Sequence, residues 1–380
     1  MESMCARFLW SGSLDSTKGV KVSWANACFP KSEGGLELRR LGIWNSTLCL
    51  KLVWLIFSGS GSLWVAWHHH HHLTCKSFWS ITASPADSWN WKSLLNLRSL
   101  AEAFVKCKLG NGHRASFWFD SWCHLGPLIK AFGVNGPSLL RIPLQSSVAD
   151  ACDAHGWTIQ PSRSIHALPL HSLLSQISPP SAPEIDSYSW VIQDKSYLVF
   201  PTAKTWNATR PRSTTRDWAS SIWFKGATPK HAFNMWIAQL QRLPTRARLA
   251  SWGLQVPTTC CLCSAHVESQ DHLLLSCSFR KQVWDLIQSR LRLIARTFST
   301  WSSLISWTRM STATSPTFLR KLVSQATVYH LWRQRNNALH NRIIISPAAV
   351  FKLIEKDLRN TITARRNMKN FRNLMALWIR

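Results

Sequence analysis

Acidic side chains are scarce in this 380-residue chain, where 18 aspartates and glutamates stand against 45 lysines and arginines. No two aspartates are adjacent anywhere in the sequence. Enzymes that copy or cut nucleic acids hold paired Mg²⁺ ions with clustered carboxylates. The sequence also lacks a phosphate-binding G-x-x-x-x-G-K-S/T loop, an H-E-x-x-H helix and a G-x-S-x-G elbow. These absences predict that the chain is not an enzyme and has no small-molecule substrate.

The sequence indicates neither a signal peptide nor a membrane-spanning segment. The first residues include Glu2 and Arg7 and no uninterrupted apolar run, so secretion is not indicated. The most apolar stretch, Leu48 to Trp67, contains Lys51 and the run Ser58-Gly-Ser-Gly-Ser62, which breaks a membrane-spanning pattern. We expect a buried helix, a turn and a second short segment there, no membrane partner, and a nuclear or cytoplasmic location.

The cysteines do not form a disulfide framework. Their number, 11, is odd, and outside residues 260–277 they are scattered singly. A hydrophobic content of 46% nevertheless suffices for at least one sizeable core. The sequence therefore predicts a folded chain that does not depend on disulfides.

Positive charge is abundant instead. The formal net charge is +27, which implies a polyanionic partner, most simply RNA or DNA bound without sequence specificity. Alternatively, the chain is a fragment of a larger polyprotein whose acidic regions balanced this excess.

One segment carries the spacing of a metal site. Cys260, Cys263, His272 and Cys277 follow the pattern C-x2-C-x8-H-x4-C, in which a tight turn and a return segment supply four zinc ligands. Four protein ligands close the coordination shell, so the pattern predicts structural zinc. Cys261 is an ambiguous neighbour and His266 a possible substitute ligand, while ordinary buried cysteines are the simpler alternative.

The flanks of this segment resemble a known family. Upstream stand Trp223, Pro229-Lys230, Phe233, Trp236, Arg248-Leu249 and Gly253, and downstream stand Glu268-Ser-Gln-Asp-His272-Leu273 and Val283-Trp284. This order is similar to the plant reverse transcriptase zinc-binding domain, a C-terminal part of LINE-type (non-LTR) retrotransposon polyproteins. Leu109-Gly-Asn-Gly112, Phe117-Trp-Phe-Asp-Ser-Trp122 and Trp332-Arg-Gln-Arg-Asn336 resemble the same polyproteins, yet their Tyr/Phe-x-Asp-Asp polymerase signature is absent here.

The predicted fold is mainly α, with a small β-hairpin and a short zinc knuckle embedded in a helical C-terminal domain. We expect a post-polymerase connection-like region over 1–126, with a hairpin near 104–122 because Asn111-Gly112 lies between two short runs. A Ser/Pro-rich linker or poorly ordered region follows over 127–219, marked by Ser178-Pro-Pro-Ser-Ala-Pro183. The zinc-binding domain covers 220–300, and a basic helical region covers 301–380.

Six basic residues around the zinc segment are candidates for phosphate contacts. They lie on helices whose other faces are apolar, and a merely solvated basic face is the alternative. They are Lys230, Arg242, Arg246, Arg248, Arg280 and Lys281.

Three functions are compatible with these patterns. The first is a non-catalytic, zinc-stabilised nucleic-acid-binding remnant of a LINE-type reverse transcriptase, a kind of module that the resemblance implies would help a polymerase hold RNA or DNA. The second is an accessory fragment that complements a separate reverse transcriptase polypeptide. The third is a decayed retroelement product without a selected function.

Overall fold

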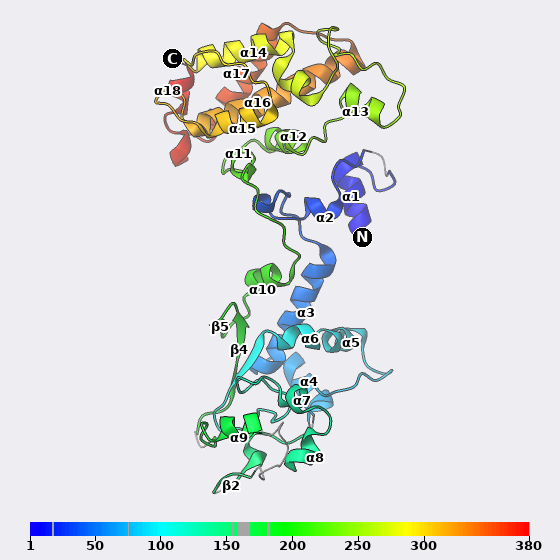
Figure 1. Ribbon diagram of the computed structural model, residues 1–380, viewed down its shortest axis with the longest axis vertical. Helices are drawn as coiled ribbons and strands as arrows, with labels where there is room; N and C mark the ends of the chain where they lie inside the picture. Colours follow the sequence, from blue (N-terminus) through cyan, green and yellow to red (C-terminus); the bar gives the residue numbers. More distant parts are fainter. Residues whose placement is uncertain (17–18, 75, 154, 159–167, 181–182, 380) are drawn as a thin grey trace. The chain divides into compact units, whose positions relative to one another are not determined.

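The computed structural model describes residues 1–16, 19–74, 76–153, 155–158, 168–180 and 183–379. It is about 51% helical with only a few short strands, which confirms the predicted fold class. Its contacts divide the chain into two compact units (Figure 1). Unit 1 joins residues 1–39 to residues 212–380, and unit 2 comprises residues 40–211.

Unit 1 is a helical domain built around one long helix. That helix, α16 (Thr317–Asn336), packs against α12 (Pro229–Gln239), α15 (Trp301–Arg309) and α17 (Pro347–Ala364), and α17 packs in turn on α14 (Ser278–Arg290). Figure 1 shows these helices together, from green to red. The other elements are α1 (Glu2–Ser11), α2 (Trp24–Ala27), η1 (Lys31–Glu33), α11 (Ala219–Ile222), α13 (Arg246–Ser251), η4 (His272–Ser276), η5 (Asn337–Asn341), η6 (Lys369–Phe371) and α18 (Leu374–Ile379).

Local sequence signals set the ends of these helices. Helix α12 begins after Thr228 with a proline in its first turn, where the missing amide costs no helical hydrogen bond. The side chain of Ser346 caps α17 by accepting a hydrogen bond from the Ala349 amide. The apolar stripe of α14, with Val283, Trp284 and Ile287, is buried, and the helix ends at Arg290, so Ile294 lies beyond it and is 90% exposed.

The N-terminal segment belongs to the core of unit 1. The ring of Trp10 stacks on that of Trp236 with centroids 6.3 Å apart. The indole N–H of Trp236 donates a 2.7 Å hydrogen bond to the Gly34 carbonyl. Residues 1–39 therefore pack with the zinc-binding region, not with residues 40–126 as the predicted first domain has it.

Unit 2 combines short helices with two small sheets. Its helices are α3 (Leu41–Ser58), α4 (Leu63–His72), α5 (Trp89–Asn96), α6 (Arg98–Glu102), α7 (Leu128–Phe132), α8 (Gly136–Leu140), η2 (Ala149–Ala151), α9 (Leu168–Leu174) and α10 (Thr202–Thr209). The strands β1 (Val105–Lys108), β4 (Ser187–Ile192) and β5 (Lys195–Tyr197) form an antiparallel sheet in the order β1-β4-β5. A second pair joins β2 (Cys152–Asp153) to β3 (Gly156–Trp157).

The predicted hairpin near 104–122 is wrong in its pairing. Strand β1 pairs with β4, with Val105 opposite Trp190, and residues 109–122 contain no strand. The Asn111-Gly112 segment turns instead around Asp186, whose carboxylate accepts hydrogen bonds from the amides of Gly110, Gly112, Arg114 and Ala115 at 2.7–3.1 Å. A Cβ on Gly110 would lie 2.3 Å from the Glu184 carbonyl oxygen, so this approach requires glycine. The local hairpin of the sheet is β4–β5.

The described part of 127–219 is folded, so its prediction as a linker or poorly ordered region is wrong there. Leu128, Leu140 and Trp190 are at most 1% exposed and belong to the core of unit 2. Their burial offsets the cost of ordering a segment rich in serine and proline. Residues 181–182 of the predicted linker motif lie outside the described residues.

Helix α3 has the length and composition of a membrane-crossing helix, with a mean hydropathy of 1.4 over its 18 residues. Core helices of soluble proteins pass the same test, and α3 packs on α5, α10 and β4 within unit 2. It ends at Ser58, and α4 starts at Leu63, which confirms the predicted helix, turn and second segment.

Candidate metal centre and basic groove

A short loop presents the first two candidate zinc ligands. An antiparallel bridge between Thr259 and Val267 closes this loop, and the Cys260 amide donates a 2.7 Å hydrogen bond to the His266 carbonyl. At the tip, Ser264 adopts a positive φ of 53° and donates its amide to the Cys260 carbonyl. The tight turn brings the side chains of Cys260 and Cys263 to one side.

The other two candidate ligands follow on η4 and at the start of α14. His272 opens η4, and Cys277 precedes α14. Ligand atoms of Cys260, Cys263, His272 and Cys277 all lie within 4.8 Å of one another. The structure therefore brings together the complete set that the spacing predicts.

The geometry fits a tetrahedral zinc ion. The Cys260 and Cys277 sulfurs are 4.0 Å apart, and the Cys263 sulfur lies 3.3 Å from His272 Nε2. Zinc–sulfur bonds of about 2.3 Å place two sulfurs about 3.8 Å apart across a tetrahedral edge. Four protein ligands leave no coordination position for a substrate, so this centre would brace the fold.

The two alternative ligands lie outside this set. The Cys261 sulfur points toward the Arg335 carbonyl oxygen at 3.9 Å, and burial raises the pKa of its thiol to about 11. The ring of His266 stacks beside that of His272 with centroids 5.3 Å apart, so it neighbours a ligand instead of replacing it.

The thiol of Cys260 is favoured to ionise, whereas the hydrogen bond with Cys260 and burial raise the pKa of the Cys277 thiol. The hydrogen bond from Cys277 lowers the pKa of the Cys260 thiol, and the positive charge of Arg280 favours the thiolate further. Three thiolates and one neutral histidine around Zn²⁺ carry a net charge of −1, which the guanidinium of Arg280 can balance. A nearby charge of this kind stabilises the metal-binding form of the ligands.

Arg280 was predicted to contact phosphate, and this prediction is wrong. Its side chain is fully buried, with a relative exposure of 0%, beside Cys277 and Cys260. Arg280 lies on α14, three residues after the ligand Cys277. The helix therefore directs Arg280 into the core and leaves Lys281 exposed.

The remaining candidate basic residues differ in how available they are. Arg242 and Lys281 are exposed, as is Lys230, whose Nζ lies 3.3 Å from Asp357. Arg246 donates a 2.7 Å hydrogen bond to the Thr259 carbonyl and so supports the knuckle. Arg248 donates to the Gln241 carbonyl and lies over the Trp252 ring at 5.2 Å.

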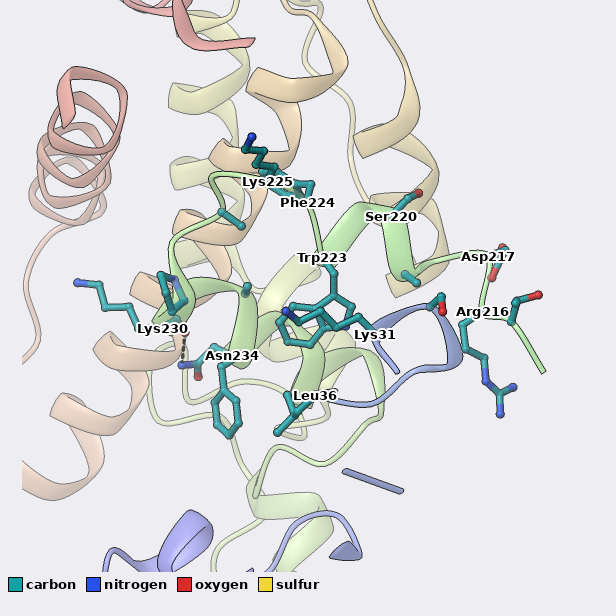
Figure 2. A pocket seen from close by; sticks show the side chains of 17 residues that line it. Lys31, Leu36, Arg216, Asp217, Ser220, Trp223, Phe224, Lys225, Lys230 and Asn234 are labelled. Atoms are coloured by element: carbon teal, nitrogen blue, oxygen red, sulfur yellow. Dashed lines mark hydrogen bonds between the residues drawn. The ribbon is translucent and has the colours of Figure 1, made fainter. Parts of the chain in front are cut away.

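A groove of about 1050 Å³ runs along the N-terminal end of α12 in unit 1. Its cationic lining comes from Lys31, Arg216, Lys225 and Lys230, and its aromatic lining from Trp223, Phe224 and Phe233. Figure 2 shows Trp223 in the middle of the lining residues with Lys31 beside it, while Lys225, Lys230 and Arg216 stand around them. The Lys31 ammonium lies 5.8 Å from the centroid of the Trp223 ring.

Sequence reasoning missed Lys31, Arg216 and Lys225 as candidate site residues. They come from segments about 180 residues apart, joined by an amide-to-carbonyl hydrogen bond of 2.7 Å from Arg216 to Ser32. The nearest sequence signal is Pro30-Lys31, which resembles the region just after the polymerase in the same polyproteins. The lining carboxylate, Asp217, is paired with Arg309 at 3.1 Å, which leaves the groove predominantly positive.

A closed Cys3His knuckle lies inside the helical domain of unit 1 and defines a candidate zinc-binding module. Residues 200–284 match the family described as zinc-binding in reverse transcriptase. The chain thus carries a reverse transcriptase zinc-binding domain, as its motifs indicate.

Two proteins of Arabidopsis thaliana are similar to the chain. One, named "Putative ribonuclease H protein At1g65750", is 25% identical over 296 residues, which are 75% of this chain and 46% of that protein. The other, named "Uncharacterized mitochondrial protein AtMg00310", is 25% identical over 123 residues, which are 32% of this chain and 80% of that protein. The chain thus spans about half the length of the first relative, and no solved structure matches it.

These comparisons support a retrotransposon-derived protein. They also correct the prediction that the chain is not an enzyme, because a relative that aligns with 75% of it is named for a nuclease. Motifs that are absent from this chain do not exclude an activity of that relative, since the alignment covers only 46% of it.

Proposed function

We propose that unit 1 is a zinc-braced module that binds single-stranded RNA or DNA. The observation that carries this proposal is the groove, which is lined by four cationic side chains and by the aromatic ring of Trp223. Proteins that hold single strands without sequence preference combine a positive groove with aromatic rings on which bases stack. The groove offers both components within one unit.

The charge distribution supports an extended contact. Arg242 and Lys281 are exposed basic residues of the same unit, and the whole chain has a net charge of +27. Neutralising phosphates releases counterions, so binding gains free energy from each additional cation at low salt. We propose that these residues extend the phosphate path beyond the groove, in a nuclear or cytoplasmic protein.

Zinc has a bracing role in this proposal. With Cys260, Cys263, His272 and Cys277 as its ligands, the ion would fix the segment between α13 and α14, up to the residue that precedes α14. The N-terminal half of α12 lines the groove, and the chain continues from its C-terminal end through α13 to the knuckle. Loss of zinc would then disturb nucleic-acid binding indirectly.

Hydrolysis of nucleic acid is a second candidate function, favoured by the name of the 25% identical relative. In this second function, unit 1 would bind the nucleic-acid strand that a nuclease site cleaves. That site would lie on this chain or on a separate reverse transcriptase polypeptide. Cleavage of a labelled RNA–DNA hybrid in Mg²⁺ by the purified full chain tests it, and an intact hybrid under conditions that saturate binding would count against it.

Binding of a fluorescent single-stranded oligonucleotide across a salt series tests the first proposal. We expect the logarithm of affinity to fall linearly with the logarithm of salt concentration. In Lys31→Gln and Lys225→Gln, the slope should shrink by about 0.7 per lost phosphate contact. Lys195→Gln, at an exposed position of β5 in unit 2, is the matched control and should keep the slope. Equal slopes in all variants, or no binding even at low salt, would contradict the proposed groove.

A further inference from the structure

A second cluster of potential metal ligands lies in unit 1, apart from the cysteines. His231 on α12, His330 on α16 and Asp357 on α17 each offer one ligand atom, and these atoms all lie within 4.8 Å of one another. The Nε2 atoms of His231 and His330 lie 3.1 and 3.0 Å from the same oxygen, Oδ2 of Asp357. Three helices thus direct three ligands at one point.

The two imidazoles are held firmly in place. His231 is 3% exposed and His330 is 4% exposed, while the Asp357 side chain is 25% exposed and reaches the surface. The ring of Tyr329 packs on that of His231, with centroids 4.7 Å apart. Nδ1 of His330 is buried without a hydrogen-bond partner among the described residues, so nothing on that side of the ring fixes its tautomer. In the metal-free chain Nε2 is hydrogen-bonded to Asp357 Oδ2, and its lone pair becomes available to an ion once the ring proton lies on Nδ1.

The distances suit a tetrahedral ion. With bonds of about 2.0–2.2 Å to histidine nitrogen and carboxylate oxygen, neighbouring ligand atoms lie about 3.3 Å apart. The two nitrogen-to-oxygen distances of 3.1 and 3.0 Å need only a small outward shift. Two imidazoles and one carboxylate are ligands that suit zinc and related divalent transition metals.

From this geometry we infer that His231, His330 and Asp357 form a second metal site, which takes a divalent ion of the zinc class. The site differs from the Cys3His centre because three protein ligands leave the fourth coordination position open. Lys230 stands at this side, with its ammonium 3.3 Å from Asp357 Oδ2 and its side chain 51% exposed. The ammonium competes with the ion for the carboxylate and is free to swing toward solvent when the ion binds.

Titration of the metal-free full chain with Co²⁺ distinguishes the two sites without any mutation. Cobalt at the Cys3His centre gives an intense thiolate-to-metal charge-transfer band, whereas cobalt held by two histidines and a carboxylate gives only ligand-field bands. We expect the charge-transfer band to saturate after one equivalent and the ligand-field absorption to keep rising until a second. Saturation of both bands at one equivalent would overturn the second site.

Variants assign the second equivalent to these residues. His330→Gln and Asp357→Asn keep the size and hydrogen-bonding capacity of the side chains, and each should lose the second equivalent while retaining the charge-transfer band. That retained band also shows that the zinc-binding fold is intact. The exposed histidines His70 and His71 on α4 are the alternative cobalt ligands, so the control replaces both with Asn. If this control loses the second equivalent and His330→Gln keeps it, the inference is wrong.

Discussion

Glu268 and Arg335 form a buried ion pair that joins two of the sequence motifs of this chain. Oε1 of Glu268 accepts hydrogen bonds from Nη2 and Nε of Arg335 at 2.7 and 3.0 Å, and from the Arg246 amide at 3.0 Å. Glu268 precedes the histidine ligand of the knuckle, and Arg335 lies near the end of α16. The zinc-binding segment is thereby fixed to the central helix of unit 1.

Removing one partner of this pair should destabilise unit 1 strongly. Glu268 is 0% exposed, so Glu268→Gln leaves the Arg335 charge buried without its counter-ion. We expect a loss of about 3–5 kcal/mol in the free energy of unfolding, measured by denaturant titration. Arg333→Gln, on an exposed position of the same helix, should change it by less than about 0.5 kcal/mol. A similar small effect of Glu268→Gln would show that the pair does not hold the knuckle.

Two cysteines of the same loop, Cys261 and Cys263, allow a matched test of the zinc ligands. Cys263→Ser should reduce the zinc content of the purified chain, because it removes a thiolate from the cluster. Cys261→Ser should leave it unchanged, since that sulfur points toward the Arg335 carbonyl instead. Zinc per chain, measured by elemental analysis, decides between them. Equal zinc in both variants and the wild type would exclude the proposed ligand set.

Arg280 and Lys281 are neighbours on α14 with opposite environments, and their variants should separate zinc affinity from nucleic-acid affinity. Arg280→Gln removes the buried positive charge beside the thiolates and should weaken zinc binding about 10- to 100-fold in competition with a chelator. Lys281→Gln should leave zinc affinity unchanged and reduce only the salt dependence of oligonucleotide binding. Unchanged zinc affinity in Arg280→Gln would mean that its charge is not coupled to the metal centre.

Unit 2 should lose stability on mild acidification because of His68. Burial, followed by the charges of the neighbouring histidines, lowers the pKa of His68 from 6.5 to about 4. The unfolded chain then binds a proton that the folded chain does not, so stability falls as pH drops from 6.5 toward 4. Between pH 7 and pH 5 this effect amounts to about 1–2 kcal/mol.

Thermal melting at several pH values checks this expectation. His68 packs against the rings of Trp64 and Trp91, at centroid distances of 4.2 and 4.8 Å, so His68→Phe keeps an aromatic ring in the same place. This variant should be less sensitive to acid than the wild type. His70→Phe changes an exposed residue of the same run and should behave like the wild type. Identical pH profiles for all three proteins would be the contrary result.

Local patterns predicted the parts of unit 1 that depend on nearby residues. The four clustered ligands lie within 18 residues, and the starts of α12 and α17 follow from proline and serine positions that act over one helical turn. The apolar spacing of Val283, Trp284 and Ile287 likewise marks the buried face of α14.

Features that depend on distant segments were not predictable from one sequence. The partner of β1 lies about 80 residues further along, so the strong turn signal at Asn111-Gly112 favoured a local hairpin. Arg280 and Lys281 are adjacent and equally charged, and only the packing of α14 decides which of them is buried. The cluster of His231, His330 and Asp357 likewise exists only because three separate helices meet.

The discontinuous composition of unit 1 has a consequence for how the protein is synthesised. Residues 1–39 leave the ribosome before residues 212–380, and partners such as Trp236 follow about 200 residues later. Throughout that interval Trp10 and the segment around Gly34 have no native surface to pack on, while unit 2 can already be completed. A nascent chain stalled before α12 should therefore expose its first helix to proteases and chaperones, and one released after α17 should protect it.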